Sequence, residues 1–327
     1  MKTLVLFDLD GVIFCEDGYF ACAALSIARF FLQKQPQWLN DVVHPDQVAT
    51  KKDVEQIRNI FLPDDILDAL RQKAINNNWD KAFVCVAGLD AITTPCLEPS
   101  DIREHLALWL SLHKSVGQAF LHSVAELKTS YSFAKASLFD EVKSVFQRCY
   151  LGDAQAQTKL LQQGLIEQET TVIAVDEIAC VLRSLTSCGM VLGVGTGRPR
   201  EEALRPLQSL GLLPFFDRIR VSTHDDVRLE EAKRQLPPGS LGKPHPFVYQ
   251  RAAFDYEPRN TVIVGDSPAD ALAANAAGFT FYGVGTEASF GTNALIAQAV
   301  FADIRSLPAA LGCNLSDPEC YNRQEKR

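Results

Sequence analysis

The stretch TLVLFDLDGVI, residues 3–13, joins an apolar run to two carboxylates. Residues 3–7 form a short, continuous apolar run, which predicts a strand buried on both faces of a parallel sheet. Asp8 and Asp10 follow at once, although a buried strand should avoid charged groups. We therefore interpret the two carboxylates as the point where the strand leaves the sheet.

Strand-like and helix-like segments alternate after residue 172. Alternation of this kind indicates βα units with right-handed crossovers and a parallel sheet. We expect an α/β fold with a doubly wound, Rossmann-like sheet that includes residues 3–7. The other predicted strands are 190–195, 218–222, 261–265, 279–285 and 299–304, and the predicted helices are 175–189, 199–211, 246–254, 268–278 and 305–312.

The intervening segment has a different character, because its apolar residues recur at helical spacing. Helices are expected at residues 19–34, 63–75, 100–113, 132–150 and 154–163. The sequence thus predicts a core made of residues 1–15 and 172–312, an inserted and mostly helical domain at 16–171, and a polar C-terminal tail at 313–327.

Composition excludes several classes of protein. The 327 residues carry a net charge of −8, which argues against a nucleic-acid-binding protein. Nine cysteines form no C-x-x-C pair, which favours free thiols in a reducing compartment over a disulfide framework. No apolar run approaches the roughly 20 residues of a membrane span. Asp8 interrupts the first apolar run too early for a signal peptide. We expect a soluble, cytoplasmic protein without nucleic-acid or membrane partners.

Carboxylates gather at the predicted strand ends. In open α/β sheets the functional groups collect at the carboxyl ends of the strands. Asp8 and Asp10, two positions apart in an extended segment, point the same way about 6.6 Å apart. Asp266 and Asp270 follow the strand at 261–265. Such a concentration of negative charge predicts a cation, and Mg²⁺ prefers oxygen ligands. Turn and helix-cap roles could explain each carboxylate alone, but their joint position at strand ends favours one reaction centre.

Two further motifs fit phosphate binding. Thr196 and Gly197 lie where a strand turns into a helix, and backbone amides at such a point bind phosphate oxygens. Lys243, between Gly242 and Pro244, could neutralise phosphate charge, although an exposed loop lysine is the simpler interpretation. A dinucleotide site is the alternative for the glycines. The string GVGTG at 193–197 fails the G-x-G-x-x-G pattern because Arg198 takes the third position, whereas GVGTEA at 283–288 fits a variant late in the sheet.

Together these stretches resemble the four motifs of the haloacid dehalogenase superfamily of hydrolases. The matching stretches, in order, are FDLDGVI, VGTGRP, GKPHPF and IVGDSPADALAANAAG. The resemblance implies that Asp8 is a nucleophile forming an aspartyl-phosphate and that Asp10 is the general acid and base. Thr196, Gly197 and Lys243 would hold the phosphoryl group. Asp8, the backbone carbonyl of Asp10, and Asp266 would bind Mg²⁺, with Asp270 supporting the metal from behind its ligands.

The resemblance further implies a phosphoglycolate phosphatase-like enzyme. We expect a Mg²⁺-dependent phosphatase that hydrolyses small phosphorylated metabolites, since an inserted cap would hinder bulky polymers. A sugar phosphomutase of the same superfamily, or a non-catalytic binding or regulatory protein, remains open, as does the oligomeric state. The sequence departs from related phosphatases at Cys15 and Glu16 and in the large insert. Basic cap residues that could choose the substrate are Arg29, Arg103, His105 and His113, although each fits a surface role better.

Overall fold

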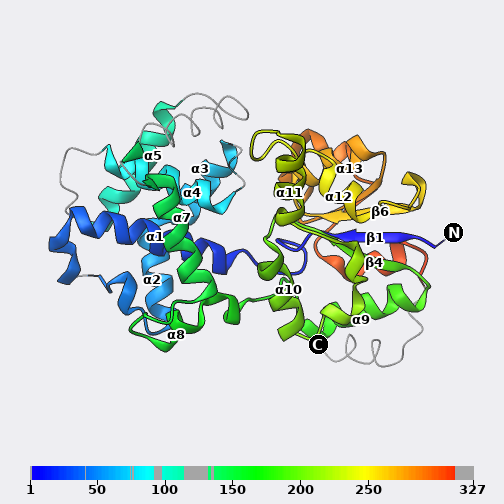
Figure 1. Cartoon of the computed structure of the whole chain (residues 1–327), viewed down its shortest axis with the longest axis horizontal. Coiled ribbons are helices and arrows are strands. Elements are labelled where there is room, and N and C mark those ends of the chain that lie inside the picture. The colour runs from blue at the N-terminus through cyan, green and yellow to red at the C-terminus, as the bar shows by residue number, and fades with distance from the viewer. Residues whose placement is uncertain are drawn as a thin grey trace. The chain divides into compact units, whose positions relative to one another are not determined.

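The computed structural model describes residues 2–40, 42–73, 75, 77–91, 98–113, 132–133 and 136–313. The chain forms two compact units (Figure 1). The sheet unit comprises Met1–Glu16 and Glu169–Arg327, and the helical unit comprises Asp17–Gln168. None of the helices in the described ranges is long and apolar enough to cross a membrane.

A six-stranded parallel sheet forms the centre of the sheet unit, with the strand order β5-β4-β1-β6-β7-β8. The apolar run at the N-terminus is the inner strand β1, whose side chains are all buried. The α/β, doubly wound architecture expected from the sequence is confirmed. The strands are β1 (Leu4–Phe7), β4 (Val191–Gly195), β5 (Val221–Ser222), β6 (Thr261–Gly265), β7 (Thr280–Val284) and β8 (Ala299–Phe301).

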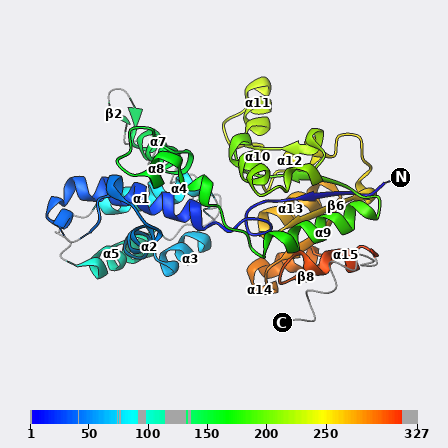
Figure 2. The ribbon, with the colours of Figure 1, turned by 90° about the horizontal axis from the view of Figure 1, so that it is seen from below.

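Helices cover both faces of this sheet. Val5 and Phe7 share one hydrophobic core with α9, whereas Leu4 and Leu6 share another with α12 and α13. Figure 2 shows α9 and α12 on opposite sides of the sheet. Alternate residues of β1 therefore face opposite layers, as a strand buried on both sides requires. The helices are α9 (Val175–Ser187), α10 (Arg200–Ser209), α11 (His224–Arg234), α12 (Phe247–Ala252), α13 (Pro268–Ala277), α14 (Glu287–Phe290) and α15 (Leu307–Ala310).

The helical unit packs around α1, which contacts α2, α4 and α7. Its hydrophobic core includes the stacked rings of Tyr19 and Tyr150, whose centroids are 4.5 Å apart. The elements are α1 (Asp17–Lys34), α2 (Lys51–Phe61), α3 (Asp64–Gln72), α4 (Asn78–Asp90), α5 (Pro99–Leu112), β2 (Ser132–Phe133), β3 (Ala136–Ser137), α7 (Leu138–Leu151) and α8 (Lys159–Gln163).

Several sequence predictions need correction. The expected helix at 154–163 begins only at Lys159, because the Thr158 side chain accepts a hydrogen bond from Leu161 N and caps the helix there. The expected strand at 218–222 is extended only at Val221–Ser222, because the Asp217 side chain accepts a hydrogen bond from Ile219 N and caps a 3-10 turn. The expected helix at 132–150 begins at Leu138, since Ser132–Phe133 pairs instead with Ala136–Ser137 in an antiparallel ladder.

A further correction concerns the cysteines. Six cysteines within the described ranges are free thiols, in line with the sequence, but Cys180 on α9 is in a disulfide. The expectation of free thiols is therefore wrong at Cys180. The predicted tail at 313–327 lies outside the described residues from position 314 onward.

Candidate functional site

The carboxyl ends of the central strands meet at one edge of the sheet. Phe7 at the end of β1 pairs with Val194 of β4 on one side and with Val264 of β6 on the other. The residues that follow these strands, Asp8, Thr196 and Asp266, therefore leave the sheet at the same edge. A parallel sheet brings the carboxyl ends of its strands to one edge, and the observed pairing aligns the ends of β1, β4 and β6 there.

Three carboxylates form a compact cluster at this edge. Asp8, Asp266 and Asp270 each offer an oxygen atom within 4.8 Å of the others. Asp270 is in the first turn of α13, where Ser267 caps the helix and donates from its hydroxyl to Asp270 Oδ2 at 2.6 Å. Gly11, with φ of +67°, lies so close to Asp266 that a Cβ atom there would overlap the carboxylate. The cluster thus depends on a capping box and on a glycine.

Lys243 connects two members of the cluster. Its ammonium nitrogen lies 2.9 Å from Asp8 Oδ1 and 2.7 Å from Asp270 Oδ1, and its side chain is 13% exposed. Burial acts to lower the pKa of Lys243, but the charges of Asp270 and Asp8 outweigh burial and raise the pKa above its usual value. The lysine therefore stays charged at neutral pH and is not an exposed loop residue.

The carboxylates of the cluster differ in their electrostatics. Burial raises the pKa of Asp8 to about 7, with Lys243 opposing the shift. Burial, Asp270 and Asp8 together raise the pKa of Asp266 well above its usual range. Burial also acts on Asp270, but Lys243, Ser267 and Tyr249 lower its pKa overall. The negative charge around Asp8 and Asp266 is thus incompletely balanced by Lys243, and a divalent cation would favour the ionised form of both groups.

Tyr249 is a site residue that the sequence reasoning missed. Its hydroxyl donates to Asp270 Oδ1 at 2.7 Å, and the whole residue is buried. A side chain at Gly195, the last residue of β4, would collide with the Tyr249 ring, so this glycine gives the ring its space. The available signal was the position of Tyr249 on the helix that directly follows Lys243.

Thr196 and Gly197 follow β4 as predicted. Thr196 is fully buried, and its Oγ1 accepts a hydrogen bond from Arg198 N at 3.1 Å. Since the oxygen accepts this bond, the hydroxyl hydrogen can be donated elsewhere. Gly197 is exposed with open space around its Cα, and α10 begins three residues later. Both residues suit contact with a ligand at this edge of the sheet.

Asp10 has a different environment from the cluster. Its carboxylate forms an ion pair with Arg198, whose Nη2 lies 2.6 Å from Asp10 Oδ1. Arg198 also contacts Glu169, at 3.1 Å between Nη1 and Oε1. Neither Arg198 nor Glu169 was predicted as a site residue. In the sequence, Arg198 breaks a glycine pattern and lies in the stretch VGTGRP, but neither feature indicated a role for its side chain. No local signal pointed to Glu169.

The four basic residues singled out in the insert have partners inside the helical unit. Arg29 pairs with Asp46, and Arg103 Nε lies 2.8 Å from Asp65 Oδ2. The last two, His105 and His113, place Nδ1 at 2.6 and 2.9 Å from backbone carbonyls one turn earlier. None of these four contacts involves a residue of the sheet unit.

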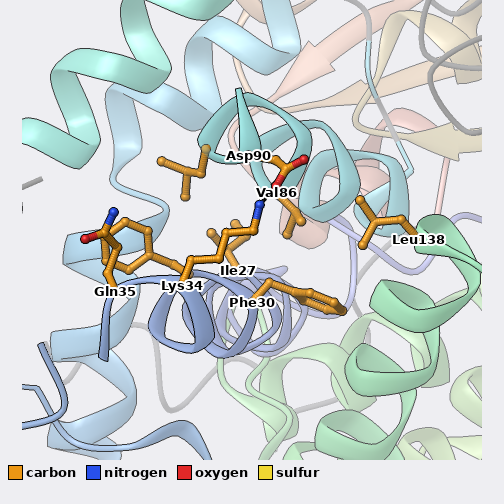
Figure 3. Close-up of a pocket in the computed structure, with 9 residues that line it drawn as sticks. Ile27, Phe30, Lys34, Gln35, Val86, Asp90 and Leu138 are labelled. Atoms are coloured by element: carbon orange, nitrogen blue, oxygen red, sulfur yellow. Dashed lines mark ion pairs between the residues drawn. The ribbon is translucent and has the colours of Figure 1, made fainter. Parts of the chain in front are cut away.

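A small cavity of about 80 Å³ lies in the helical unit (Figure 3). Its lining is mainly apolar, with Ile27 and Val86 among the side chains, and it contains the ion pair of Lys34 with Asp90. The cavity includes none of the residues predicted to carry chemistry. The cavity is thus separate from the carboxylate cluster at the sheet edge.

Comparison with known proteins shows the family of the chain. The family model of the haloacid dehalogenase-like hydrolases matches residues 2–278. The chain is 34% identical to validoxylamine A 7'-phosphate phosphatase of Streptomyces hygroscopicus subsp. limoneus over 116 residues, which are 35% of this chain and 48% of that protein. It is 33% identical to pyrophosphatase PpaX of Bacillus pumilus (strain SAFR-032) over 120 residues, 36% of this chain and 49% of that protein. The matches thus span about half the length of these relatives.

A solved structure extends the likeness to the whole chain. The X-ray structure of a structural-genomics target is 27% identical and superimposes with a TM-score of 0.71, covering 95% of this chain and 98% of that chain. The family match spans most of the chain and includes all four motifs at the sheet edge. The protein belongs to the haloacid dehalogenase-like hydrolase family.

Proposed function

We propose that the protein is a Mg²⁺-dependent phosphatase that hydrolyses small phosphate monoesters through an aspartyl-phosphate on Asp8. The observation that carries the proposal is the buried Asp8, Asp266 and Asp270 cluster with Lys243 between Asp8 and Asp270. Its phosphatase relatives support the same chemistry.

The donor set fits Mg²⁺. All the side-chain ligands are carboxylate oxygens. Burial, together with the neighbouring carboxylates, raises the pKa of Asp8 and of Asp266, and a bound cation would oppose that shift. Asp8, the backbone carbonyl of Asp10, and Asp266 would hold the ion, with Asp270 supporting them. When bound, Mg²⁺ supplies positive charge that keeps Asp8 ionised and screens it from the phosphate oxygens.

The residues of the chain have separate roles in the two steps of the proposed reaction. An oxygen of Asp8 attacks phosphorus while Asp10 gives a proton to the leaving oxygen as its bond to phosphorus breaks. Lys243 orients Asp8 and offers charge to the phosphoryl oxygens, and the Thr196 hydroxyl and the backbone at Gly197 add hydrogen bonds. In the second step Asp10 takes a proton from the water that cleaves the aspartyl-phosphate. Splitting the reaction in this way replaces one difficult displacement with two easier ones.

The helical unit is proposed to act as a cap that restricts substrates to small phosphorylated metabolites. Its position in the chain, between the first and second motifs, supports this role. A cytoplasmic location also stays a prediction, supported by the six free thiols and opposed by the disulfide at Cys180. Fractionation of cells tests it.

A panel of small phosphate esters with Mg²⁺ tests the proposal. We expect wild type to release phosphate and to carry a covalent phosphoryl label, and Asp8→Asn to lose both by at least ~10³-fold. The exposed Asp64 provides the matched control, since Asp64→Asn removes a carboxylate of the helical unit and should leave turnover unchanged. Equal phosphate release by wild type and Asp8→Asn would disprove the assignment. Bisphosphate-activated isomerisation without phosphate release would identify a phosphomutase.

A further inference from the structure

We propose that Arg198 is a positioning residue, which holds the carboxylate of Asp10 in place and ties it to the two segments where the chain passes between its units. The inference rests on the proposed function, because it assigns a role in the proton transfer by Asp10. Both residues lie within the matched motif stretches, but the resemblance gave no role to Arg198 and did not relate it to Asp10.

The contact between Arg198 and Asp10 is directional. Nε and Nη2 of Arg198 donate to the same oxygen, Asp10 Oδ1, at 2.9 and 2.6 Å. Two donors from a planar guanidinium hold the Oδ1 atom from two points in one plane, whereas a lysine would offer a single point charge.

Arg198 is itself held firmly. Its side chain is 1% exposed, and its Nη1 donates to Glu169 Oε1 at 3.1 Å and to the Glu202 carbonyl at 3.2 Å. The guanidinium carbon lies 4.8 Å from the centre of the Phe14 ring. A buried guanidinium needs such partners, since an unpaired buried charge is costly. The same partners make Arg198 a rigid reference point for Asp10.

Two of these partners lie in the short segments 13–16 and 169–172 of the sheet unit, which adjoin the helical unit Asp17–Gln168 in the chain. We call these segments the crossings: the first contains Phe14, and the second begins at Glu169. The crossings run side by side, because Cys15 N donates to Thr170 O at 2.9 Å and Val172 N donates to Ile13 O at 3.1 Å. Arg198 thus joins Asp10 to both crossings through contacts that all lie within the sheet unit.

The chemistry of proton donation provides a selective test. When the bond between phosphorus and an alkyl oxygen breaks, its electron pair needs the proton of Asp10. A p-nitrophenolate leaves as a stable anion and does not need it. Misplacing Asp10 should therefore slow alkyl esters far more than p-nitrophenyl phosphate. A purely structural role of Arg198 would slow both substrates alike.

The experiment measures kcat/KM with Mg²⁺ for p-nitrophenyl phosphate and for the best alkyl phosphate of the panel. We expect Arg198→Lys to slow the alkyl ester ~30- to 300-fold and p-nitrophenyl phosphate less than ~5-fold. Glu169→Gln should shift the ratio of the two rates in the same direction, by ~3- to 10-fold. If Arg198→Lys does not fold, Glu169→Gln decides alone, and an unchanged ratio rejects the inference.

Two further variants make the test more specific. Arg220 is a matched control, since it is buried and pairs with Asp255, so Arg220→Lys should leave the ratio unchanged. If Arg198 acts through Asp10, Asp10→Asn combined with Arg198→Lys should be no slower on the alkyl ester than Asp10→Asn alone, within ~2-fold. Additive losses, or equal losses on both esters, overturn the inference alone. A wild type that releases phosphate from neither ester overturns the proposed function and this inference together.

Discussion

The hydroxyl of Tyr249 and the ammonium of Lys243 converge on one atom, Asp270 Oδ1, each at 2.7 Å. The ammonium also lies 5.0 Å from the centre of the Tyr249 ring. Both Tyr249 and Asp270 are fully buried. Tyr249 therefore restricts the position of Asp270, and through Asp270 it restricts the position of Lys243 beside the proposed nucleophile.

Removing this hydroxyl should weaken catalysis more than folding. For Tyr249→Phe we expect kcat to fall ~10-fold with little change in KM, because Lys243 and Asp270 lose part of their orientation. The free energy of unfolding should fall by about 1 kcal/mol, the usual net value of one hydrogen bond. Steady-state kinetics and denaturant unfolding measure the two effects. Tyr282→Phe on β7 is the control, and a kcat loss as large in that variant would argue against a specific role.

Gly11 should be intolerant of a side chain for two separable reasons. Gly11→Ala places a Cβ against the Asp266 carboxylate. It also forces an alanine to adopt a φ of +67°, a backbone conformation that favours glycine. We expect at least a ~50-fold loss of turnover and weaker Mg²⁺ activation, because Asp266 must move. Gly211 has φ of +70° and open space around it, so Gly211→Ala reports backbone strain alone. Comparable turnover in the two variants would contradict the importance of the contact with Asp266.

Metal-free stability should depend on pH through Asp8. Its carboxyl ionises near 3.8 when unfolded, and burial raises its pKa to about 7 in the folded protein. Between these values the folded state binds more protons than the unfolded state, so stability falls as pH rises through this window. The raised pKa of Asp266 adds to the same trend, whereas the lowered pKa of Asp270 acts below this range and the raised pKa of Lys243 acts above it.

Asp8→Asn removes the ionisable carboxyl and with it the loss of stability at high pH. Comparing this variant with wild type therefore measures the effect. In EDTA at pH 8 we expect the variant to be more stable than wild type by about 1–3 kcal/mol, and the difference should shrink toward pH 5. Denaturant unfolding at several pH values measures it. A difference that stays constant or grows as pH falls would contradict the electrostatic account of Asp8.

Mg²⁺ should stabilise the protein through the same carboxylates. Binding to the folded state alone raises the melting temperature as the ion concentration rises. We expect this rise for wild type, and we expect most of it to be lost in Asp266→Asn. Asp255→Asn, which removes a carboxylate of the sheet unit that pairs with Arg220, should retain the rise. An equal Mg²⁺ response in all three proteins would remove Asp266 from the proposed ligand set.

The sequence by itself determined the fold class and the edge of the sheet where chemistry is expected. The apolar run of β1 and the later alternation of strands and helices follow from local periodicity, and a parallel sheet brings its strand ends together by geometry. Asp8, Thr196 and Asp266 could thus be predicted to share one edge. Short segments such as 218–222 were less predictable, because a single side-chain cap at Asp217 changed the local backbone.

Only the tertiary structure decided which polar groups pair within that edge. Asp10 and Arg198 are 188 residues apart, and no periodic pattern relates them. The same holds for Lys243 between Asp8 and Asp270, and for the ring of Tyr249 against Gly195. Hydrophobic spacing specifies which face of an element is buried. The partners of buried charges depend instead on distances between distant elements, which exist only once the sheet unit has folded.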